Sequence, residues 1–358
     1  MIVFHLHELG WNSFFQQHVK TGDSRIPARI VEEQRSAYRV LCAAGELPAE
    51  TAGHLRHAAM GRSGLPAVGD WVLIEARLAE GRATIHEVLP RKSKFSRKSA
   101  GQETAEQIVA ANIDTVFLMT SLNADLNLRR IERYLTTVWD SGAQPVVLLS
   151  KADLCEDSTA AMEAVASVAF GVPIHTLSSV TGDGLAQIRE YLRPGRTAAL
   201  LGSSGVGKST LINRLLGDEV QKVREIREDD ARGRHTTSAR RLFLLRGGGM
   251  LIDTPGMREL QLWDTGDGLS QTFDDIQLLA HDCRFRDCRH ESEPGCAVQS
   301  ALAGHQLSSE RFESYVKLRR ELEHLARKQD VFARTEQNRK WRRIHKAARE
   351  LYKHRNKP

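Results

Sequence analysis

The segment Gly202-Ser203-Ser204-Gly205-Val206-Gly207-Lys208-Ser209-Thr210 is the most informative part of this chain of 358 residues. An apolar run over residues 198–201 precedes it, and a helical pattern of apolar residues follows it over residues 211–216. This spacing of glycine, lysine and serine between a strand and a helix is the pattern of a phosphate-binding P-loop. The alternative is a glycine- and serine-rich turn without a ligand, and the correct flanks on both sides favour the P-loop.

The P-loop residues have separate roles in phosphate binding. The glycines let backbone N–H groups approach a diphosphate without interference from a Cβ atom, and the following helix directs the positive end of its dipole towards it. We expect Lys208 to contact the β and γ phosphates and the Ser209 hydroxyl to bind Mg²⁺. The segment therefore predicts a nucleoside triphosphate site that uses Mg²⁺.

Short apolar runs alternate with helical patterns before the P-loop. The sequence predicts strands over 115–119, 145–149 and 174–177 and helices over 128–139, 161–170 and 185–192. This alternation is typical of an α/β domain whose parallel sheet is covered on both faces. Ligands of such domains bind at the carboxyl ends of the strands.

Two polar segments follow predicted strands of this sheet. Ser150-Lys151-Ala152-Asp153 follows one strand, and Ser178-Ser179 follows the next. The Asp153 carboxylate can accept hydrogen bonds from the N1–H and the exocyclic amine of guanine, a donor pair that adenine lacks. We therefore expect Ser150, Lys151, Asp153, Ser178 and Ser179 to form a guanine-specific base site.

Two segments after the P-loop suit the γ-phosphate side of such a site. Gly233-Arg234-His235-Thr236-Thr237-Ser238 resembles a mobile segment, in which Thr236 or Thr237 completes the Mg²⁺ shell. Asp253-Thr254-Pro255-Gly256 follows a predicted strand, so the Asp253 carboxylate can hold a metal-bound water and the Gly256 N–H can contact a γ-phosphate. Alone, this second pattern is explained by a plain turn; its position after a P-loop makes it informative.

Three cysteines and a histidine are crowded into fourteen residues as Cys283-x4-Cys288-x-His290-x5-Cys296. Four nitrogen and sulfur ligands make a closed tetrahedral shell that suits a structural Zn²⁺. The alternative is a few buried cysteines and a surface histidine. His281 is a weaker fifth ligand candidate, and the remaining cysteines, Cys42 and Cys155, stand apart as thiols of the core or surface.

The N-terminal part has a different pattern of apolar residues. Residues 1–27 show no clear period and form an extension without an assigned role. Residues 28–98 contain short β-like runs separated by glycine and proline, which predicts a small β-barrel. Its last segment, 90–98, has five cations and one aromatic residue, Phe95. An RNA-binding surface that stacks a base and a solvated basic connector fit this segment equally.

The net charge of +6 is concentrated at the C-terminus. Apolar residues recur at three- and four-residue intervals over 308–325, which predicts an amphipathic helix that packs against the zinc-binding unit. Residues 326–358 carry dense clusters of lysine and arginine, one of them around Trp341. Charge runs are usually only solvated, but this tail accompanies a β-barrel, so we favour contact with RNA.

Composition limits the compartment and the class of protein. A hydrophobic content of 41% supplies cores for two or three domains. The first residues lack the pattern of a signal peptide, and no stretch of the sequence approaches the length of a membrane span. Five cysteines in a chain that is expected to be cytoplasmic argue against a disulfide framework. We expect a cytoplasmic monomer without a membrane partner.

The nucleotide motifs occur in a shifted order. GTPases ordinarily carry the P-loop first and the base-reading motifs last, whereas here the base-reading segments come first, so the domain looks circularly permuted. With the cysteine cluster and the barrel, the chain resembles the ribosome small-subunit-dependent GTPase A family along most of its length. The match is carried by Pro66-Ala67-Val68-Gly69-Asp70-Trp71-Val72, 202–210, 233–237, 253–256 and 283–296.

This resemblance implies a domain organisation and a function. The domains are an OB-fold β-barrel over 28–98, a circularly permuted α/β P-loop GTPase domain over 109–275 and a C-terminal α-helical zinc-binding domain over 276–325, before the basic tail 326–358. The implied activity is GTP hydrolysis to GDP, stimulated by the small ribosomal subunit and its rRNA, late in maturation of that subunit. The implied cofactors are one structural Zn²⁺ and Mg²⁺ with GTP.

Two positions depart from the usual GTPase pattern. Ser150 stands where GTPases carry Asn or, in this family, often Thr. Met257 stands where many GTPases carry a Gln that orients the attacking water, so we expect slow basal turnover and a catalytic group supplied by His235 or by the partner. His235 as an ordinary loop histidine is equally consistent with the sequence.

Permutation also has a mechanical consequence. The segment 253–256, which senses the γ-phosphate, continues directly into the C-terminal domain, so we expect that domain to respond to the nucleotide state. A different function remains open, in which an RNA-binding zinc protein uses GTP as a regulatory ligand without partner-stimulated hydrolysis. A metabolic P-loop kinase is disfavoured, because it needs neither Asp153, nor the zinc cluster, nor the basic tail.

Overall fold

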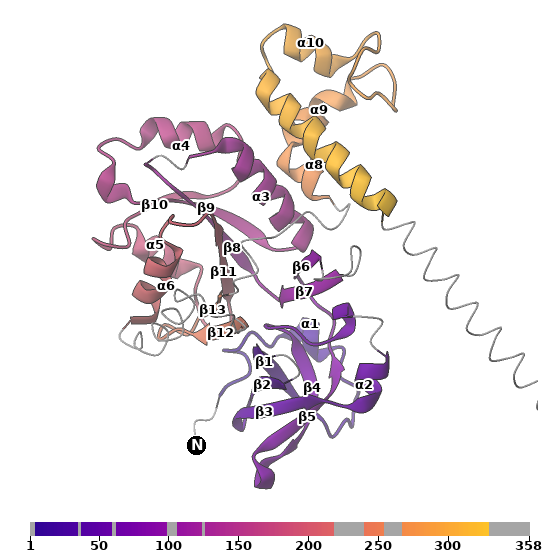
Figure 1. The fold of residues 1–358 in the computed structure, drawn as a ribbon, viewed down its shortest axis with the longest axis vertical. Helices are drawn as coiled ribbons and strands as arrows, with labels where there is room; N and C mark the ends of the chain where they lie inside the picture. The colour runs from indigo at the N-terminus through magenta and orange to yellow at the C-terminus, as the bar shows by residue number, and fades with distance from the viewer. Residues whose placement is uncertain are drawn as a thin grey trace, which may run out of the picture.

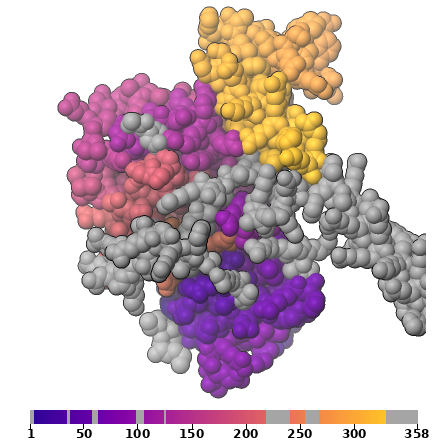
Figure 2. Space-filling view, viewed as in Figure 1, coloured from indigo at the N-terminus to yellow at the C-terminus, as the bar shows by residue number. Residues whose placement is uncertain are grey.

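The computed structural model describes residues 4–34, 37–58, 62–98, 106–123, 126–217, 240–253 and 267–328. Figure 1 shows a β-barrel at the bottom of the view, an α/β region above it and a helical unit at the top. The space-filling view shows the same order, with the helical unit and the barrel at opposite ends of the molecule (Figure 2). Within the described ranges, no helix has the length and apolar character that a membrane span requires.

Among the described residues, the barrel is built from five short strands. Its strands are β1 (Ile26–Gln34), β2 (Ala37–Cys42), β3 (Gly45–Thr51), β4 (Trp71–Arg77) and β5 (Arg82–Val88). The strand order is β1-β2-β3-β5-β4, and β4 pairs back with β1, so the sheet closes on itself. The β3–β5 pair is parallel and the others are antiparallel. This closed arrangement is the predicted OB-fold barrel.

Short elements accompany the barrel. They are α1 (Ser13–Gln16), α2 (Gly53–Ala58), two 3-10 turns at Arg62–Gly64 and Leu78–Glu80, and the hairpin strands β6 (Lys94–Lys98) and β7 (Glu106–Ala111). The β6–β7 hairpin carries the barrel into the α/β region, because β7 is followed closely by the first strand of the next sheet.

The α/β region has the predicted alternation of strands and helices. In chain order it contains β8 (Thr115–Ser121), α3 (Leu128–Ser141), β9 (Gln144–Ser150), a 3-10 turn (Ala152–Leu154), α4 (Thr159–Ala166), β10 (Ile174–Leu177), α5 (Leu185–Glu190), β11 (Thr197–Gly202), α6 (Lys208–Leu216), β12 (Arg240–Leu244) and β13 (Met250–Asp253). The sheet order is β10-β9-β8-β11-β13-β12, with β12 antiparallel to β13 and the other neighbours parallel.

Alternate residues of the central strands pack on opposite faces of this sheet. Val116 and Leu118 of β8 share a core with α3 and α4, whereas Phe117 and Met119 share a core with α5 and α6. A period of two is what a strand covered on both faces produces. The P-loop strand β11 lies at the centre, and the strands that lead to the base-reading segments precede it in the chain, which confirms the permuted order.

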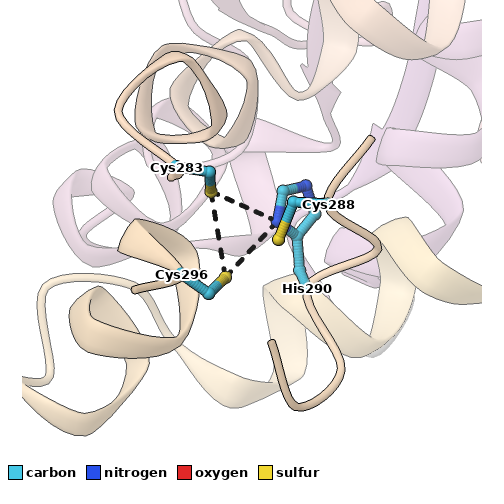
Figure 3. Close-up of side chains that lie close together, drawn as sticks. All are labelled: Cys283, Cys288, His290 and Cys296. Carbon is cyan, nitrogen blue, oxygen red and sulfur yellow. Dashed lines mark hydrogen bonds between the residues drawn. The ribbon is translucent and has the colours of Figure 1, made fainter. Parts of the chain in front are cut away.

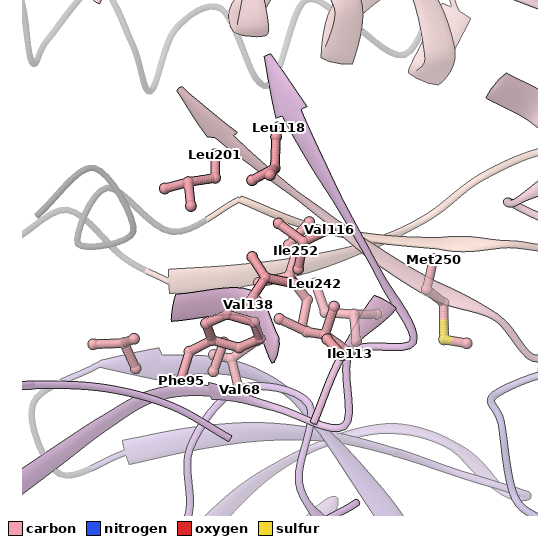
Figure 4. Close-up of a cluster of buried hydrophobic side chains, with 14 of the residues drawn as sticks. Val68, Phe95, Ile113, Val116, Leu118, Val138, Leu201, Leu242, Met250 and Ile252 are labelled. Carbon is pink, nitrogen blue, oxygen red and sulfur yellow. The ribbon is translucent and has the colours of Figure 1, made fainter. Parts of the chain in front are cut away.

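The barrel and the α/β sheet are joined into one sheet. Strand β1 pairs with β12 at Glu32↔Arg241 and Glu33↔Arg240, and the Arg240 guanidinium lies 2.9 Å from the Glu33 carboxylate. One hydrophobic core runs beneath this junction, and Figure 4 shows Val68 and Phe95 of the barrel side beside Val116, Ile252 and other residues of the α/β sheet. The two parts therefore share both a sheet and a hydrophobic core.

The basic segment 90–98 is largely used for packing. The Phe95 ring is 1% exposed, which rules out the alternative in which this ring stacks an RNA base. The Arg91 guanidinium pairs with the buried Asp70 carboxylate at 2.7 Å, and Lys94 pairs with Glu106 at 3.1 Å. For Arg91, Lys94 and Phe95 these contacts support the connector interpretation, which the sequence left open.

The N-terminal segment packs into the same core. Leu9 and Phe15 are buried there, and the buried Arg29 of β1 connects this segment to both sheets. Its guanidinium donates to the Leu9 carbonyl, to the Gly69 and Asn112 carbonyls at 3.3 and 3.1 Å, and to the Thr197 hydroxyl at 2.8 Å. Burial lowers the pKa of Arg29 to about 10, so the side chain stays charged at neutral pH.

The helical unit contains α8 (Gly268–Thr272), α9 (Asp274–His281), α10 (Ala297–Ala303) and a helix over 309–328. The last helix confirms the predicted amphipathic pattern, because Tyr315, Leu318 and Leu322 are buried against α8 to α10. The tail beyond residue 328, including its basic clusters, lies outside the described residues.

A buried polar contact docks this unit on α3. The Glu132 carboxylate of α3 is fully buried and accepts hydrogen bonds from Arg311 at 2.9 Å and from the Ser314 hydroxyl at 2.6 Å. Arg311, on the helix over 309–328, also donates to Asp275 of α9 at 2.6 and 2.7 Å, so one guanidinium contacts both α3 and α9. The buried carboxylate is thus paired and hydrogen-bonded, as a buried charge has to be, at the contact between α3 and the helical unit.

Candidate functional site

The predicted nucleotide-binding segments meet at one edge of the sheet. The parallel register pairs Leu177 of β10 with Ser150 of β9, and Gly202 of β11 with Met119 of β8. Strand β13 runs parallel to β11 and ends at Asp253, which is half-buried. The carboxyl ends of these strands therefore bring together the base-reading segments, the P-loop and the Asp253 carboxylate.

The P-loop has an open backbone cradle. Gly205 and Gly207 have φ angles of +82° and +96°, and a Cβ atom at either position would have no other atom within 4 Å. Gly202 is instead tightly packed, because a Cβ atom there would lie 2.3 Å from the Met119 carbonyl oxygen. Helix α6 begins at Lys208, so its first free N–H groups point into this cradle, as anion binding at a helix N-terminus requires.

Hydrogen bonds within the P-loop hold Lys208, which is expected to contact the bound phosphates. Its Nζ donates to the Gly202 carbonyl at 2.7 Å and also to the Ser203 carbonyl, and the residue is 9% exposed. The ammonium group is therefore positioned beside the cradle by backbone oxygens. Ser209 follows in the first turn of α6 and is half-buried, which leaves its hydroxyl next to the same space.

Ser150 connects the base side of the site to the P-loop. Its hydroxyl donates to the Val206 carbonyl at 2.6 Å, and its oxygen lies 3.2 Å from the Thr120 carbonyl oxygen of β8. Both Ser150 and Val206 are buried. A serine at this position therefore retains a direct link between the two halves of the site, although it stands where GTPases usually carry Asn.

The other base-site candidates differ in exposure. Lys151 adopts a φ of +61°, and Asp153 is exposed in the following 3-10 turn. Ser178 is fully buried, and its hydroxyl accepts hydrogen bonds from the Val180 and Thr181 N–H groups at 3.2 and 3.1 Å. Ser178 thus shapes the turn that presents Ser179. The candidates Gly256, His235, Thr236 and Thr237, together with Met257, lie outside the described residues.

We predict that Ser150→Ala weakens GDP binding by about tenfold, because it leaves the buried Val206 carbonyl without its donor and loosens the P-loop. The measurement is the dissociation constant for a fluorescent GDP analogue. Ser150→Thr is the matched control, since it keeps the hydroxyl, and it should bind nearly as well as the unmodified chain. Equal affinities of the Ala and Thr variants would contradict this role.

The four predicted zinc ligands come together in the helical unit. The ligand atoms of Cys283, Cys288, His290 and Cys296 all lie within 4.8 Å of one another (Figure 3). The Cys283 and Cys296 sulfurs are 3.8 Å apart, and each lies 3.5 to 3.6 Å from His290 Nδ1. A tetrahedral Zn²⁺ with Zn–S distances near 2.3 Å has sulfurs about 3.8 Å apart, so the donor set fits this ion.

The surrounding backbone orients these ligands. His290 has a φ of +63°, and its carbonyl accepts a hydrogen bond from the Gln299 side chain at 2.5 Å. Burial lowers the pKa of His290, which favours the neutral imidazole that a metal needs. The exposed His281 is not among the clustered donors of the described chain. Cys42 and Cys155 stand apart, the first buried and the second half-buried, as predicted.

Comparison with known proteins gives consistent results. The RsgA GTPase family model matches residues 88–263. The chain is 46% identical over 356 residues to the small ribosomal subunit biogenesis GTPase RsgA of Opitutus terrae, a match that covers 96% of this chain and 97% of the relative. It is 47% identical over 324 residues to the small ribosomal subunit biogenesis GTPase RsgA 1 of Oceanobacillus iheyensis, covering 90% of this chain and 92% of that one.

Two solved structures have the same fold. YjeQ from Thermotoga maritima superposes with a TM-score of 0.63 at 26% identity, covering 83% of this chain and 98% of that one. YloQ, described as a circularly permuted GTPase, superposes with a TM-score of 0.62 at 24% identity, covering 86% and 98% of the two chains. The second likeness concerns the fold alone.

Proposed function

Because the chain belongs to the RsgA GTPase family, we propose that it hydrolyses GTP as a switch that binds the small ribosomal subunit late in its maturation. We further propose that the subunit and its rRNA stimulate the hydrolysis. The relatives support the partner through their names, which describe biogenesis of the small ribosomal subunit. The observation that carries the activity is the meeting of the P-loop, Ser150 and Asp253 at one sheet edge.

Each site residue has a proposed role. Lys208 and the P-loop amides hold the phosphates. Asp153 and Ser179 bind the guanine base, and Lys151 and Ser178 position these two residues. When bound, Mg²⁺ would supply positive charge that offsets the negative charge developing on the phosphate oxygens during hydrolysis. Ser209, Asp253 and one of Thr236 or Thr237 would hold this ion, and the Gly256 N–H would contact the γ-phosphate.

The zinc site has a structural role in this proposal. Cys283, Cys288, His290 and Cys296 supply four donors and leave no open coordination position, so the ion would hold the helical unit together rather than bind substrate. The unit and the basic tail would contact rRNA, with an affinity that falls steeply as salt increases. We place the protein in the cytoplasm, acting as a monomer.

We predict that His235→Ala lowers subunit-stimulated GTP hydrolysis by about a hundredfold if His235 orients the attacking water, because Met257 cannot do so. Single-turnover hydrolysis with saturating small subunits measures this effect. GDP affinity serves as the control and should be unchanged. A variant that keeps its full stimulated rate would show that the partner supplies the catalytic group.

The proposed function is tested by GTP turnover of the zinc-loaded protein, alone, with small subunits and with large subunits, at one moderate salt concentration. We expect strong stimulation by small subunits and none by large ones. Slow hydrolysis that no subunit changes, with guanine binding intact, would contradict the switch. That result would favour the alternative of an RNA-binding zinc protein with GTP as a regulatory ligand.

A further inference from the structure

A cleft of about 290 Å³ lies where the N-terminal segment, the barrel and the α/β sheet meet. Side chains from all three parts line it, among them Trp11, Phe15, Trp71, Lys92, Asp114 and Arg196. Asp114 and Arg196 immediately precede β8 and β11, whereas the P-loop follows the carboxyl end of β11. The cleft and the nucleotide site are therefore at opposite edges of the sheet.

Positive charge predominates in this cleft. Arg29, Lys92 and Arg196 belong to its lining, against the single carboxylate of Asp114. That carboxylate already accepts the Thr197 N–H at 2.8 Å and lies 3.3 Å from the Arg196 guanidinium. Burial lowers the pKa of Lys92, and repulsion from Arg196 and Arg29 lowers it further against the opposing effect of Asp114. The cations are thus close enough to repel one another.

These cations differ in whether their N–H groups are already hydrogen-bonded within the chain. Arg29 is committed to carbonyl and hydroxyl oxygens of the surrounding chain. The Lys92 ammonium lies 5.3 and 5.2 Å from the Phe14 and Phe15 ring centroids, and no hydrogen bond among the described residues uses it. Lys92 and Arg196 are both exposed. Their donors are therefore accessible to a ligand in the cleft.

The deep wall of the cleft contains an unsatisfied donor. Trp71 is fully buried, and its Nε1–H has no acceptor in the described chain. Its ring lies edge-on to Trp11 at 4.8 Å, and the Arg29 guanidinium lies 5.8 Å from its centroid. An indole N–H is a donor only, and buried donors in proteins nearly always have an acceptor. This unpaired donor marks the wall as a place where a ligand or a water molecule can supply an acceptor.

We propose that this cleft binds a phosphate-bearing ligand, which accepts hydrogen bonds from Lys92, Arg196 and the Trp71 Nε1–H. A phosphate group has several strong acceptor oxygens that do not lie in one plane, which suits donors arriving from separate parts of the chain. The Pro66 to Val72 motif, to which the nucleotide site gives no role, supplies the Trp71 wall. A ligand bound here would connect the barrel and the N-terminal segment to the α/β sheet.

The test is a titration of the full-length, zinc-loaded protein with inorganic phosphate, in the presence of saturating GDP and Mg²⁺ so that the P-loop is occupied. Trp11 and Trp71 line the cleft, so tryptophan fluorescence should change saturably. Lys92→Ala and Arg196→Ala should each weaken the binding by about tenfold or more. Arg193→Ala is the matched control, because Arg193 is exposed nearby and pairs with Glu190, and it should bind phosphate normally.

Further arms of the experiment separate the sources of the response. Trp71→Phe keeps a ring in place but removes the N–H, and should reduce the thermal stabilisation by phosphate. If a short single-stranded RNA binds at a far lower concentration than inorganic phosphate does, the bound phosphate group belongs to a nucleic-acid backbone. If it does not, the phosphate group belongs to a small molecule. An equal response to acetate at the same ionic strength, or a phosphate response unchanged in Lys92→Ala and Arg196→Ala, would overturn the proposal.

Discussion

Lys208→Ala is expected to lower GTP hydrolysis by about a hundredfold to a thousandfold. The Lys208 ammonium is held at the mouth of the P-loop by the Gly202 and Ser203 carbonyl oxygens. The ammonium group therefore lies beside the cradle, where its charge can stabilise the negative charge that develops on the γ-phosphate of a bound nucleotide. Hydrolysis under single-turnover conditions, with and without small subunits, measures this loss.

Arg214→Ala provides the control for this variant. Arg214 is an exposed cation on the same helix, α6, so the substitution removes an equal charge away from the cradle. We expect it to keep nearly full activity. If Lys208→Ala retained its rate, or if both variants lost it equally, the P-loop would not act as the phosphate site, and the assignment of the whole sheet edge would fail.

Cys288→Ser is expected to release the zinc and to unfold the helical unit over 267–328. A unit of roughly 60 residues has a small core and is marginally stable without further links. Binding of zinc to such a site contributes about 10–16 kcal/mol at neutral pH, so loss of one thiolate removes much of what stabilises the unit. Zinc content after dialysis and proteolysis of the unit are the two measurements.

The same site predicts a dependence on pH. Desolvation raises the pKa of the metal-free Cys288 thiol to about 11, so zinc must displace a proton in order to bind. Protonation of the thiols and of His290 competes with the metal, so the zinc affinity should fall as the pH decreases. Cys155→Ser is the matched control, because that thiol is outside the cluster. A Cys288→Ser protein with full zinc content would remove this residue from the shell.

Local patterns allowed much of the α/β region to be predicted from the sequence. The predicted strand 174–177 agrees with β10, and the predicted strand 145–149 lies within β9. Short apolar runs between polar turns mark such buried strands directly. The cluster of three cysteines and a histidine was equally predictable, because its four members lie within one short segment of the chain.

Features that depend on distant contacts were not predictable in this way. Phe95 lies among cations in the sequence, but its ring points into the core, while Arg91 and Lys94 form ion pairs. Residues 4–27 show no period, because their packing depends on single residues such as Leu9 and Phe15. Arg129 is a local partner of the Glu132 carboxylate, but the partners that bury this carboxylate, Arg311 and Ser314, come from a distant helix that no local pattern indicates.

The Ser150 hydroxyl is an example within the site itself. Sequence comparison with the usual GTPase pattern marks it as a departure, whereas the structure shows a hydrogen bond to the Val206 carbonyl. The sequence alone gave no indication that a shorter side chain could reach the P-loop. Whether the hydroxyl reaches the loop depends on the distance between the end of β9 and the P-loop. The packing of β9 and β11 in the sheet sets this distance.

The joint between β1 and β12 also bears on how the chain is synthesised. The barrel strands emerge from the ribosome long before residues 240–244. Part of the edge of β1 therefore stays unpaired until β12 has been synthesised. An open strand edge invites aggregation, and charged side chains on it are a common protection. Glu32 and Glu33 occupy this edge, and Arg240 and Arg241 later pair with them. The charges that protect the nascent barrel are thus the ones that select its final neighbour.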